Sequence, residues 1–232
     1  MGKNKTGKYF KYAIGEIILV VIGILIALSI SNWNQKQIEK KQIRNIYARI
    51  IQDFNHTATE IERGLSGMLI NSNLMNDIII GDISRDSLLT NDVYFQKYYF
   101  SITGYPDIQI NETGIRLLES KIELNYELNT ELTEALTLLY SEHLFEYKID
   151  EKEISNQFSR LREYFTDTGI ELEYRLNKNK EMYVNLLFND PTFKRYLFKY
   201  RRTHRAYLNR LNRFKTKGEL LIDKIKKEND LE

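Results

Sequence analysis

The chain has 232 residues and a mass of 27.6 kDa, enough for one medium-sized domain, and it contains no cysteine, two prolines and eleven glycines. This composition excludes disulfide scaffolds, thiolate metal sites, cysteine nucleophiles and collagen-like chains, and a mean hydropathy of −0.46 excludes a bundle of many membrane spans. The net charge of +2 is a cancellation, because residues 1–50 carry +7 and residues 191–232 carry +8, whereas residues 51–111 carry −5 and residues 112–190 carry −8.

The first predicted element is a transmembrane helix over residues 12–33, which read YAIGEIILVVIGILIALSISNW. A helix of this length is about 33 Å long, and a bilayer core of about 30 Å needs roughly 20 residues. Its Ile, Leu and Val side chains together favour insertion by roughly 4 to 7 kcal/mol. Glu16, the one intramembrane charge, costs about 2.5 to 3.5 kcal/mol at most, so we expect the helix to insert.

The flanks of this helix indicate its orientation. Residues 1–11 hold four lysines and no acid, which favours a basic cytoplasmic tail, an inner-membrane anchor and a periplasmic body. The opposite flank is also basic, so the reverse orientation stays open. A cleaved signal peptide is a further alternative, since Ala27-Leu28-Ser29 resembles a small-x-small cleavage site, although the apolar run from Ile17 to Ile30 is long for one.

Small residues lie along one side of the span and form a ridge that permits close contact with another membrane helix. The ridge consists of Gly15, Gly23, Ala27 and Ser31. Small residues are common in membrane helices in general, so the ridge can also be without function. Glu16 could pair with a partner or relay ions, or it could lie at the level of the lipid headgroups.

Residues 8–41 read KYFKYAIGEIILVVIGILIALSISNWNQKQIEKK. This segment resembles the start of a family of uncharacterised single-pass membrane proteins of Bacteroidota, which share a YAIGEI–LVVIGILIAL–NWN stretch followed by a long, lysine-rich helix. Beyond this segment the resemblance extends only to length and helical character. It implies a membrane anchor and a helical body, and it brings no activity and no functional residues.

Residues 34–81 predict a long stalk helix, because no strong helix breaker appears before Gly81-Asp82 and apolar residues recur at steps of three or four. This pattern is close to a heptad repeat, typical of a coiled coil. The apolar seam consists of Ile43, Tyr47, Ile50, Phe54, Ala58, Ile61, Leu65, Met68, Ser72, Met75 and Ile79.

Residues 191–232 predict a second long helix, in which Asp190 caps the start and Pro191 is the first helical residue. Its seam consists of Phe193, Leu197, Tyr200, His204, Tyr207, Leu211, Phe214, Gly218, Leu221 and Ile225. Two long helices with one apolar side each bury their seams most simply against each other, so we expect an antiparallel stalk.

Residues 82–190 then form a small, acidic, helical head. Its helices are predicted over residues 92–100, 113–119 and 125–166. Residues 170–176 alternate like a strand, but only residues 107–110 could pair with them, so we predict a helix there as well. The expected fold class is therefore all-α, with five segments: tail, transmembrane helix, stalk helix, head and C-terminal helix.

Motifs for chemistry are absent, and we expect neither an enzyme nor a cofactor. One weak metal candidate is formed by Asp53, His56 and Glu60, which share a helix face. A polar flank of the seam explains the same residues, and no second Glu-x-x-His exists to complete a di-metal bundle. His204 lies on the C-terminal seam and is predicted to be a packed residue.

A basic surface is predicted on the C-terminal helix, since residues 191–217 hold ten Lys and Arg side chains and no acid. Its residues include Lys194, Arg195, Arg201, Arg202, Arg205, Arg210 and Arg213. Interleaved aromatic residues make nucleic-acid binding conceivable. The alternative is a helix that lies against residues 112–153, which hold eleven acids and four bases.

These patterns favour a membrane-anchored scaffold or protein-interaction component of the cell envelope. Its expected partners are the lipid bilayer and either another protein or a second copy of the chain. A different class of function stays open, a ligand-sensing helical bundle that acts through a partner. Nucleic-acid binding is a weaker alternative, and it requires a cytoplasmic body.

Overall fold

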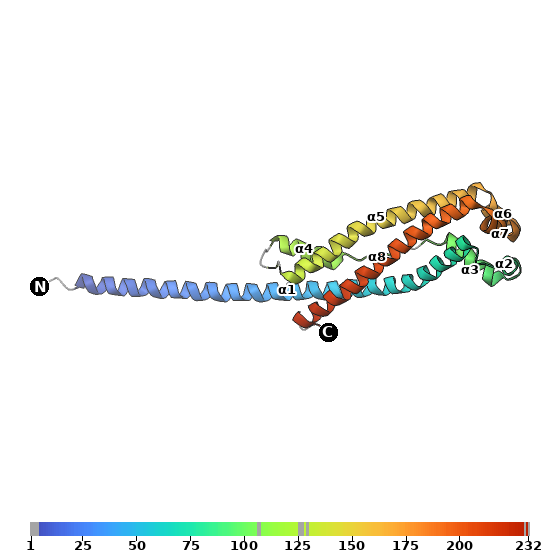
Figure 1. Ribbon diagram of the computed structural model, residues 1–232. Coiled ribbons are helices and arrows are strands. Elements are labelled where there is room, and N and C mark those ends of the chain that lie inside the picture. The colour runs from blue at the N-terminus through green and yellow to red at the C-terminus, as the bar shows by residue number, and fades with distance from the viewer. Residues whose placement is uncertain (1–4, 106–107, 125–127, 129, 230, 232) are drawn as a thin grey trace. The chain divides into compact units, whose positions relative to one another are not determined.

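The computed structural model describes residues 5–105, 108–124, 128, 130–229 and 231. These residues form eight α-helices and no β-strand, which confirms the all-α prediction (Figure 1). The helices are α1 (Lys5–Ile80), α2 (Arg85–Thr90), α3 (Asp92–Thr103), α4 (Thr113–Leu124), α5 (Glu131–Asp167), α6 (Ile170–Asn177), α7 (Lys180–Asn189) and α8 (Pro191–Asn229). The chain divides into two compact units, Met1–Ala48 and Arg49–Glu232, and α1 contributes to both.

The ends of the two longest helices follow the signals in the sequence. The last residue of α1 precedes Gly81, whose φ of +80° is a left-handed conformation that favours glycine. At the start of α8, the Asp190 carboxylate accepts hydrogen bonds from the amides of Thr192 (2.8 Å) and Phe193 (2.9 Å). Pro191 is the first residue of α8, as predicted, because its missing N–H is not needed there.

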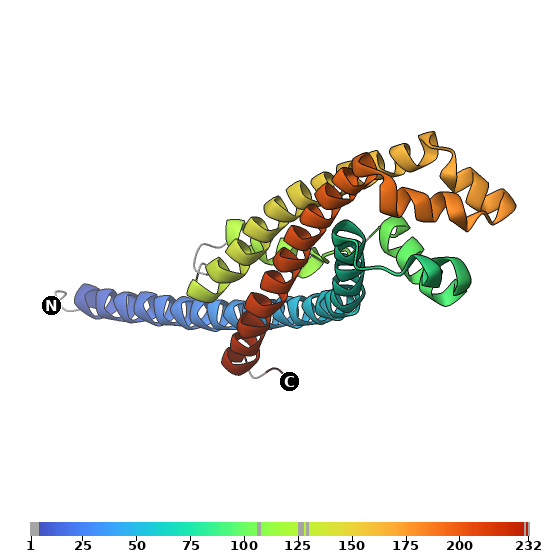
Figure 2. The same ribbon diagram turned by 45° about the vertical axis from the view of Figure 1, so that its right-hand side comes forward.

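In the second unit, α8 packs antiparallel against α5 along most of their length (Figures 1 and 2). The Arg210 guanidinium on α8 forms ion pairs with Glu146 and Asp150 on α5. Nearer the other end of the contact, the rings of Phe158 and Tyr200 lie 5.5 Å apart. The head segment therefore contributes a long helix that runs beside the C-terminal helix.

The part of α1 that belongs to this unit also runs antiparallel to α8. The rings of Phe54 and Phe214 lie 6.0 Å apart, and Arg201 Nε donates to the Ser72 carbonyl oxygen at 2.9 Å. These contacts confirm that the two long helices pack antiparallel, as predicted, but α5 covers more of α8 than α1 does. Of the C-terminal seam, Leu221 alone is partly exposed, and the other nine residues are buried.

An extended strap, residues 104–112, connects α3 to α4, and Pro106 and Asp107 within it lie outside the described residues. Side chains of the long helices bind its backbone. The Tyr200 hydroxyl donates to the Gly104 carbonyl oxygen at 2.8 Å, and the Tyr147 hydroxyl donates to the Ile108 carbonyl oxygen. The strap thus runs back along the bundle. It brings the chain to the end of the unit at which residue 49 lies, so that α5 can begin there.

The short helices enclose an aromatic cluster. Tyr183 on α7 is fully buried, and its ring lies 5.0 Å from Phe95 on α3 and 5.4 Å from Phe165 on α5. The segment with strand-like alternation is α6, as predicted, and helical spacing explains why. Ile170 and Tyr174, four residues apart, are buried, whereas a strand would place residue 172 on the same face.

Gly218 tests the contact between α8 and α1. A Cβ atom at Gly218 would lie 2.0 Å from Phe54 Cε2, so we expect Gly218→Ala to lower the free energy of unfolding by about 1–3 kcal/mol through overpacking. The matched control is Gly67→Ala, because no atom lies within 4 Å of a Cβ there. The control should stabilise α1 by up to about 1 kcal/mol through helix propensity.

Urea unfolding of the full chain in detergent micelles, followed by circular dichroism, measures both variants. Equal stabilisation by the two alanines would contradict the close contact of α8 with α1.

Candidate functional site

The first candidate site is the apolar stretch of α1 that begins at Ile14. It is the one helix, among the described residues, that is long and apolar enough to cross a membrane. None of the most apolar window is buried, and large apolar side chains are exposed on every side of the helix, from Ile14 (42% exposed) to Trp33 (63%). A core helix of a soluble protein would be buried. A signal sequence near the N-terminus has the same composition, so that alternative from the sequence stays open.

One polar group of this stretch is satisfied within its own helix. The Ser29 hydroxyl donates to the Leu25 carbonyl oxygen of its own helix at 2.8 Å. Glu16, Ala27 and Ser31 are exposed, and no atom lies within 4 Å of a Cβ atom at Gly15 or Gly23. No described residue therefore covers the small-residue ridge, and its role in helix packing stays a prediction.

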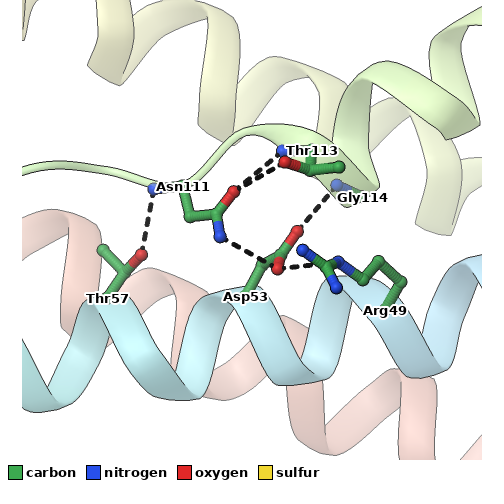
Figure 3. Close-up of polar contacts among 6 residues, drawn as sticks. All are labelled: Arg49, Asp53, Thr57, Asn111, Thr113 and Gly114. Carbon is green, nitrogen blue, oxygen red and sulfur yellow. Dashed lines mark hydrogen bonds and ion pairs between the residues drawn. The ribbon is translucent and has the colours of Figure 1, made fainter.

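The second candidate site is a polar junction between α1 and the start of α4, centred on Asp53 (Figure 3). The Asp53 side chain is only 3% exposed. Its carboxylate accepts hydrogen bonds from the Gly114 amide (2.8 Å) and Asn111 Nδ2 (3.0 Å), and it forms an ion pair with Arg49 Nε at 2.9 Å. Because α4 begins at Thr113, the negative charge lies beside the positive end of the α4 dipole.

Two further hydrogen bonds complete the junction. The backbone N–H of Asn111 donates to Thr57 Oγ1 at 3.1 Å, and Asn111 Oδ1 accepts from the backbone N–H of Thr113 at 3.1 Å. Gly114 is needed for close approach, since a Cβ atom there would lie 2.8 Å from the Ile50 backbone nitrogen. The junction therefore fixes the strap and the first turn of α4 on α1.

The contacts of Asp53, His56 and Glu60 show whether these residues are free to bind a metal ion. Both Asp53 oxygens already accept hydrogen bonds, His56 is exposed, and Glu60 pairs with Arg63 Nη1 at 2.6 Å. In the described part of the chain, no three His, Cys, Asp or Glu side chains are placed to hold a metal ion. The three residues therefore do not form a metal site in this structure, and Asp53 has a structural role.

The third candidate site is the basic surface of α8. Arg210 pairs with Glu146 and Asp150, and its hydrogen bond lowers the pKa of Glu146. Arg201 reaches the α1 backbone, as described above. The Arg210 contacts agree with a helix that lies against the acidic residues 112–153, whereas the Arg201 contact holds α8 on α1. The other predicted cations are half-exposed or exposed and have no ion pair within the described residues: Lys194, Arg195, Arg202, Arg205 and Arg213.

The buried histidines are packing residues. His204 is 2% exposed, its Nδ1 has no hydrogen-bond partner, and its ring contacts the ring of Tyr200. Burial lowers the pKa of His204 to about 4. Burial also lowers the pKa of His143, whose ring packs on Phe214. Both imidazoles are therefore neutral at pH 7, as expected for a packed His204.

Sequence reasoning missed the junction, although two signals were present. Asp53 lies between the seam residues Ile50 and Phe54, where a lone carboxylate must find donors if it is buried. Asn111 and Thr113 are residue types that cap helices, and α4 begins there.

No protein-family model, curated protein or solved structure matches this chain. The resemblance of residues 8–41 to the Bacteroidota membrane-protein family is therefore still a prediction.

The junction predicts the effect of Asp53→Asn. The variant loses the charge and presents an NH₂ group to a donor, so we expect a loss of about 2–3 kcal/mol in the free energy of unfolding. The control His56→Gln, exposed on the same helix, should change it by less than about 0.5 kcal/mol. Limited proteolysis at the strap, measured in parallel, should become faster in Asp53→Asn alone. Equal stability of both variants would contradict a structural junction.

Buried His204 predicts an acid-dependent stability. An unfolded histidine has a pKa near 6.5, so below about pH 6.5 the unfolded chain binds the proton that folded His204 does not accept until about pH 4. Stability should therefore fall between pH 6.5 and pH 4, by on the order of 3 kcal/mol from this group. The variant His204→Leu should lack that part of the decrease, measured as the difference in urea unfolding across this pH range. Parallel pH profiles for both chains would be the contradicting result.

Proposed function

We propose that this chain is a single-pass membrane protein whose helical body, residues 49–232, binds a partner protein at the cell envelope. The exposed apolar stretch of α1 carries this proposal. Each of its Ile, Leu and Val side chains gains roughly 1.5–3 kcal/mol on leaving water, and no described residue covers them. Lipid is the environment that covers such a helix on all sides.

The proposed location is the inner membrane, with the basic tail in the cytoplasm and the body in the periplasm. The four lysines of residues 1–11 support this orientation. The chain has no cysteine, so one cysteine introduced at the exposed position Ser159 of α5 (Ser159→Cys) reports the compartment in which the body lies. Labelling by a membrane-impermeant thiol reagent in intact cells is expected, and labelling only after permeabilisation would reverse the orientation.

A partner surface is supported by a second apolar face of α5. Leu138, Phe145 and Ile149 recur at steps of seven and four, and they are 55%, 69% and 53% exposed. The opposite face of α5 is already buried in the bundle. Exposed apolar patches of this kind mark interaction surfaces. The proposed role is therefore binding, and the chain shows no catalytic motif that would suggest a reaction.

The anchor predicts the behaviour of Ile22→Arg/Leu25→Arg. Two arginines near the middle of the span cost roughly 6 to 8 kcal/mol in insertion, about as much as the apolar residues supply. Carbonate extraction should leave the wild type in the membrane pellet and release the variant. The control is Asn212→Arg/Thr216→Arg, which adds the same charge on exposed positions of α8 and should stay in the pellet.

Carbonate release of the wild type would contradict the anchor. So would a mature chain that mass spectrometry finds to begin after Ser29, since that result identifies a cleaved signal peptide.

The partner surface predicts the behaviour of Phe145→Ser/Ile149→Ser. Chemical cross-linking in native membranes should yield a discrete larger species with the wild type, and the variant should reduce it at least about fivefold. Glu151→Ser/Lys152→Ser, at neighbouring exposed positions, is the control. Both variants should keep the wild-type thermal midpoint, because the replaced side chains are exposed. An adduct that survives in Phe145→Ser/Ile149→Ser would show that this face binds nothing.

A further inference from the structure

A hollow of about 410 Å³ opens between α5 and α8, and we call it the α5–α8 pocket. Helical spacing places its lining residues on one face of each helix. The α5 wall consists of Asp150, Glu153 and Gln157, and the α8 wall consists of Lys199, Arg202, Thr203 and Ala206. The antiparallel register sets the walls opposite each other, because Asp150 pairs with Arg210 beside the pocket and Phe158 meets Tyr200.

The α8 wall offers two cations. Lys199 and Arg202 are exposed, and within the described part of the chain neither has an ion-pair partner. Arg210, by contrast, is held by two carboxylates on the same neighbouring helix. Lys199 and Arg202 are therefore available to bind an anionic group that enters the pocket, and their separation by three residues puts them on one side of α8.

The α5 wall offers carboxylate oxygens and one amide oxygen without a donor. Gln157 is 9% exposed, and its Nε2 donates to Glu153 Oε1 at 2.9 Å, while its Oε1 is buried without a donor. Exchanging the amide oxygen and nitrogen would place oxygen against the Glu153 carboxylate, so the orientation is determined by chemistry. A buried acceptor without a partner costs about 1–3 kcal/mol. Among the described residues, Gln157 Oε1 therefore lacks a donor, and beside the Glu153 carboxylate a positively charged donor fits best.

We propose that the α5–α8 pocket binds a free amino acid or a similar small zwitterion. The ligand carboxylate pairs with Lys199 and Arg202, and its ammonium group donates to Glu153 and to Gln157 Oε1. A purely anionic ligand would meet the carboxylates of the α5 wall, and a purely cationic one would meet the two cations of α8. The volume accommodates an amino acid, and the small side chain of Ala206 leaves room for an apolar side chain.

The test uses the full chain in detergent micelles and follows its thermal midpoint. The zwitterions glycine, L-leucine and glycyl-L-leucine are compared with 4-methylpentanoate and 3-methylbutylamine, which each retain one charge of leucine. At least one zwitterion should raise the midpoint saturably, by several degrees at about one hundred times its Kd, and the single-charge analogues should not. The absence of a saturable shift with all three zwitterions would overturn the proposal.

Variants identify the site of binding. Arg202→Gln and Glu153→Gln should each weaken the affinity at least about tenfold, because each removes one charge that the ligand needs. The control is Arg213→Gln, an exposed, unpaired cation on the same helix outside the pocket, which should bind like the wild type. All three variants should unfold like the wild type without ligand.

Equal weakening by Arg202→Gln and Arg213→Gln would overturn the pocket, because it would show diffuse attraction to the basic surface of α8. Binding of a single-stranded oligonucleotide in place of the zwitterions, reduced equally by both variants, would be the nucleic-acid outcome and would overturn it as well.

Discussion

The strap between α3 and α4 requires hydrogen-bond partners for a backbone that runs between packed helices. Neither a helix nor a sheet satisfies the strap, so side chains of the bundle must do so. Thr57, Tyr147 and Tyr200, each from a different long helix, contact its backbone. The Tyr207 hydroxyl in turn donates to the Tyr147 hydroxyl at 3.1 Å, and burial together with that bond raises the pKa of Tyr207. The position of the strap determines where α4 begins and therefore where α5 can start.

Two close approaches between helices bring α4 and α8 onto α1. The Asp53 carboxylate can reach the first turn of α4 only because Gly114 lets the α4 backbone lie against Ile50. One turn further along α1, Gly218 leaves space for the ring of Phe54. Two glycines on two different helices thus let α4 and α8 approach α1 closely. In each case the space of a missing side chain is filled by a buried apolar residue of α1.

Local signals in the sequence were sufficient for the end of α1, the start of α8 and the buried face of α8, but the predicted helices over 92–100 and 113–119 end before α3 and α4 do. Gly81, Asp190 and Pro191 act on their immediate neighbours, and the spacing of the seam from Phe193 to Ile225 needs only one helix. Periodicity identifies which face is buried, but it does not identify the helix that covers it, so the pairing of α5 with α8 was not predicted. The same reason explains the junction at Asp53, since two of its three donors, Asn111 and Gly114, lie 58 and 61 residues away in the sequence. The partners of the strap and the close approaches depend on residues far apart in the sequence, and local periodicity does not reveal them.

Charge segregation has a structural meaning that only the register of the helices reveals. The surplus of +8 in residues 191–232 and that of −8 in residues 112–190 predict attraction, yet the totals do not say which charges meet. In the bundle, Arg210 takes two carboxylates of α5, whereas Lys199 and Arg202 face a wall whose remaining carboxylate, Glu153, already accepts from Gln157. The proposed zwitterionic ligand carries both charges, so it can pair with the cations of α8 and with the acceptors of α5 that have no partner from the opposite helix. Some cations of α8 are thus paired with α5 and others are not. The paired part, at Arg210, stabilises the fold, and the unpaired part, at Lys199 and Arg202, is available for binding.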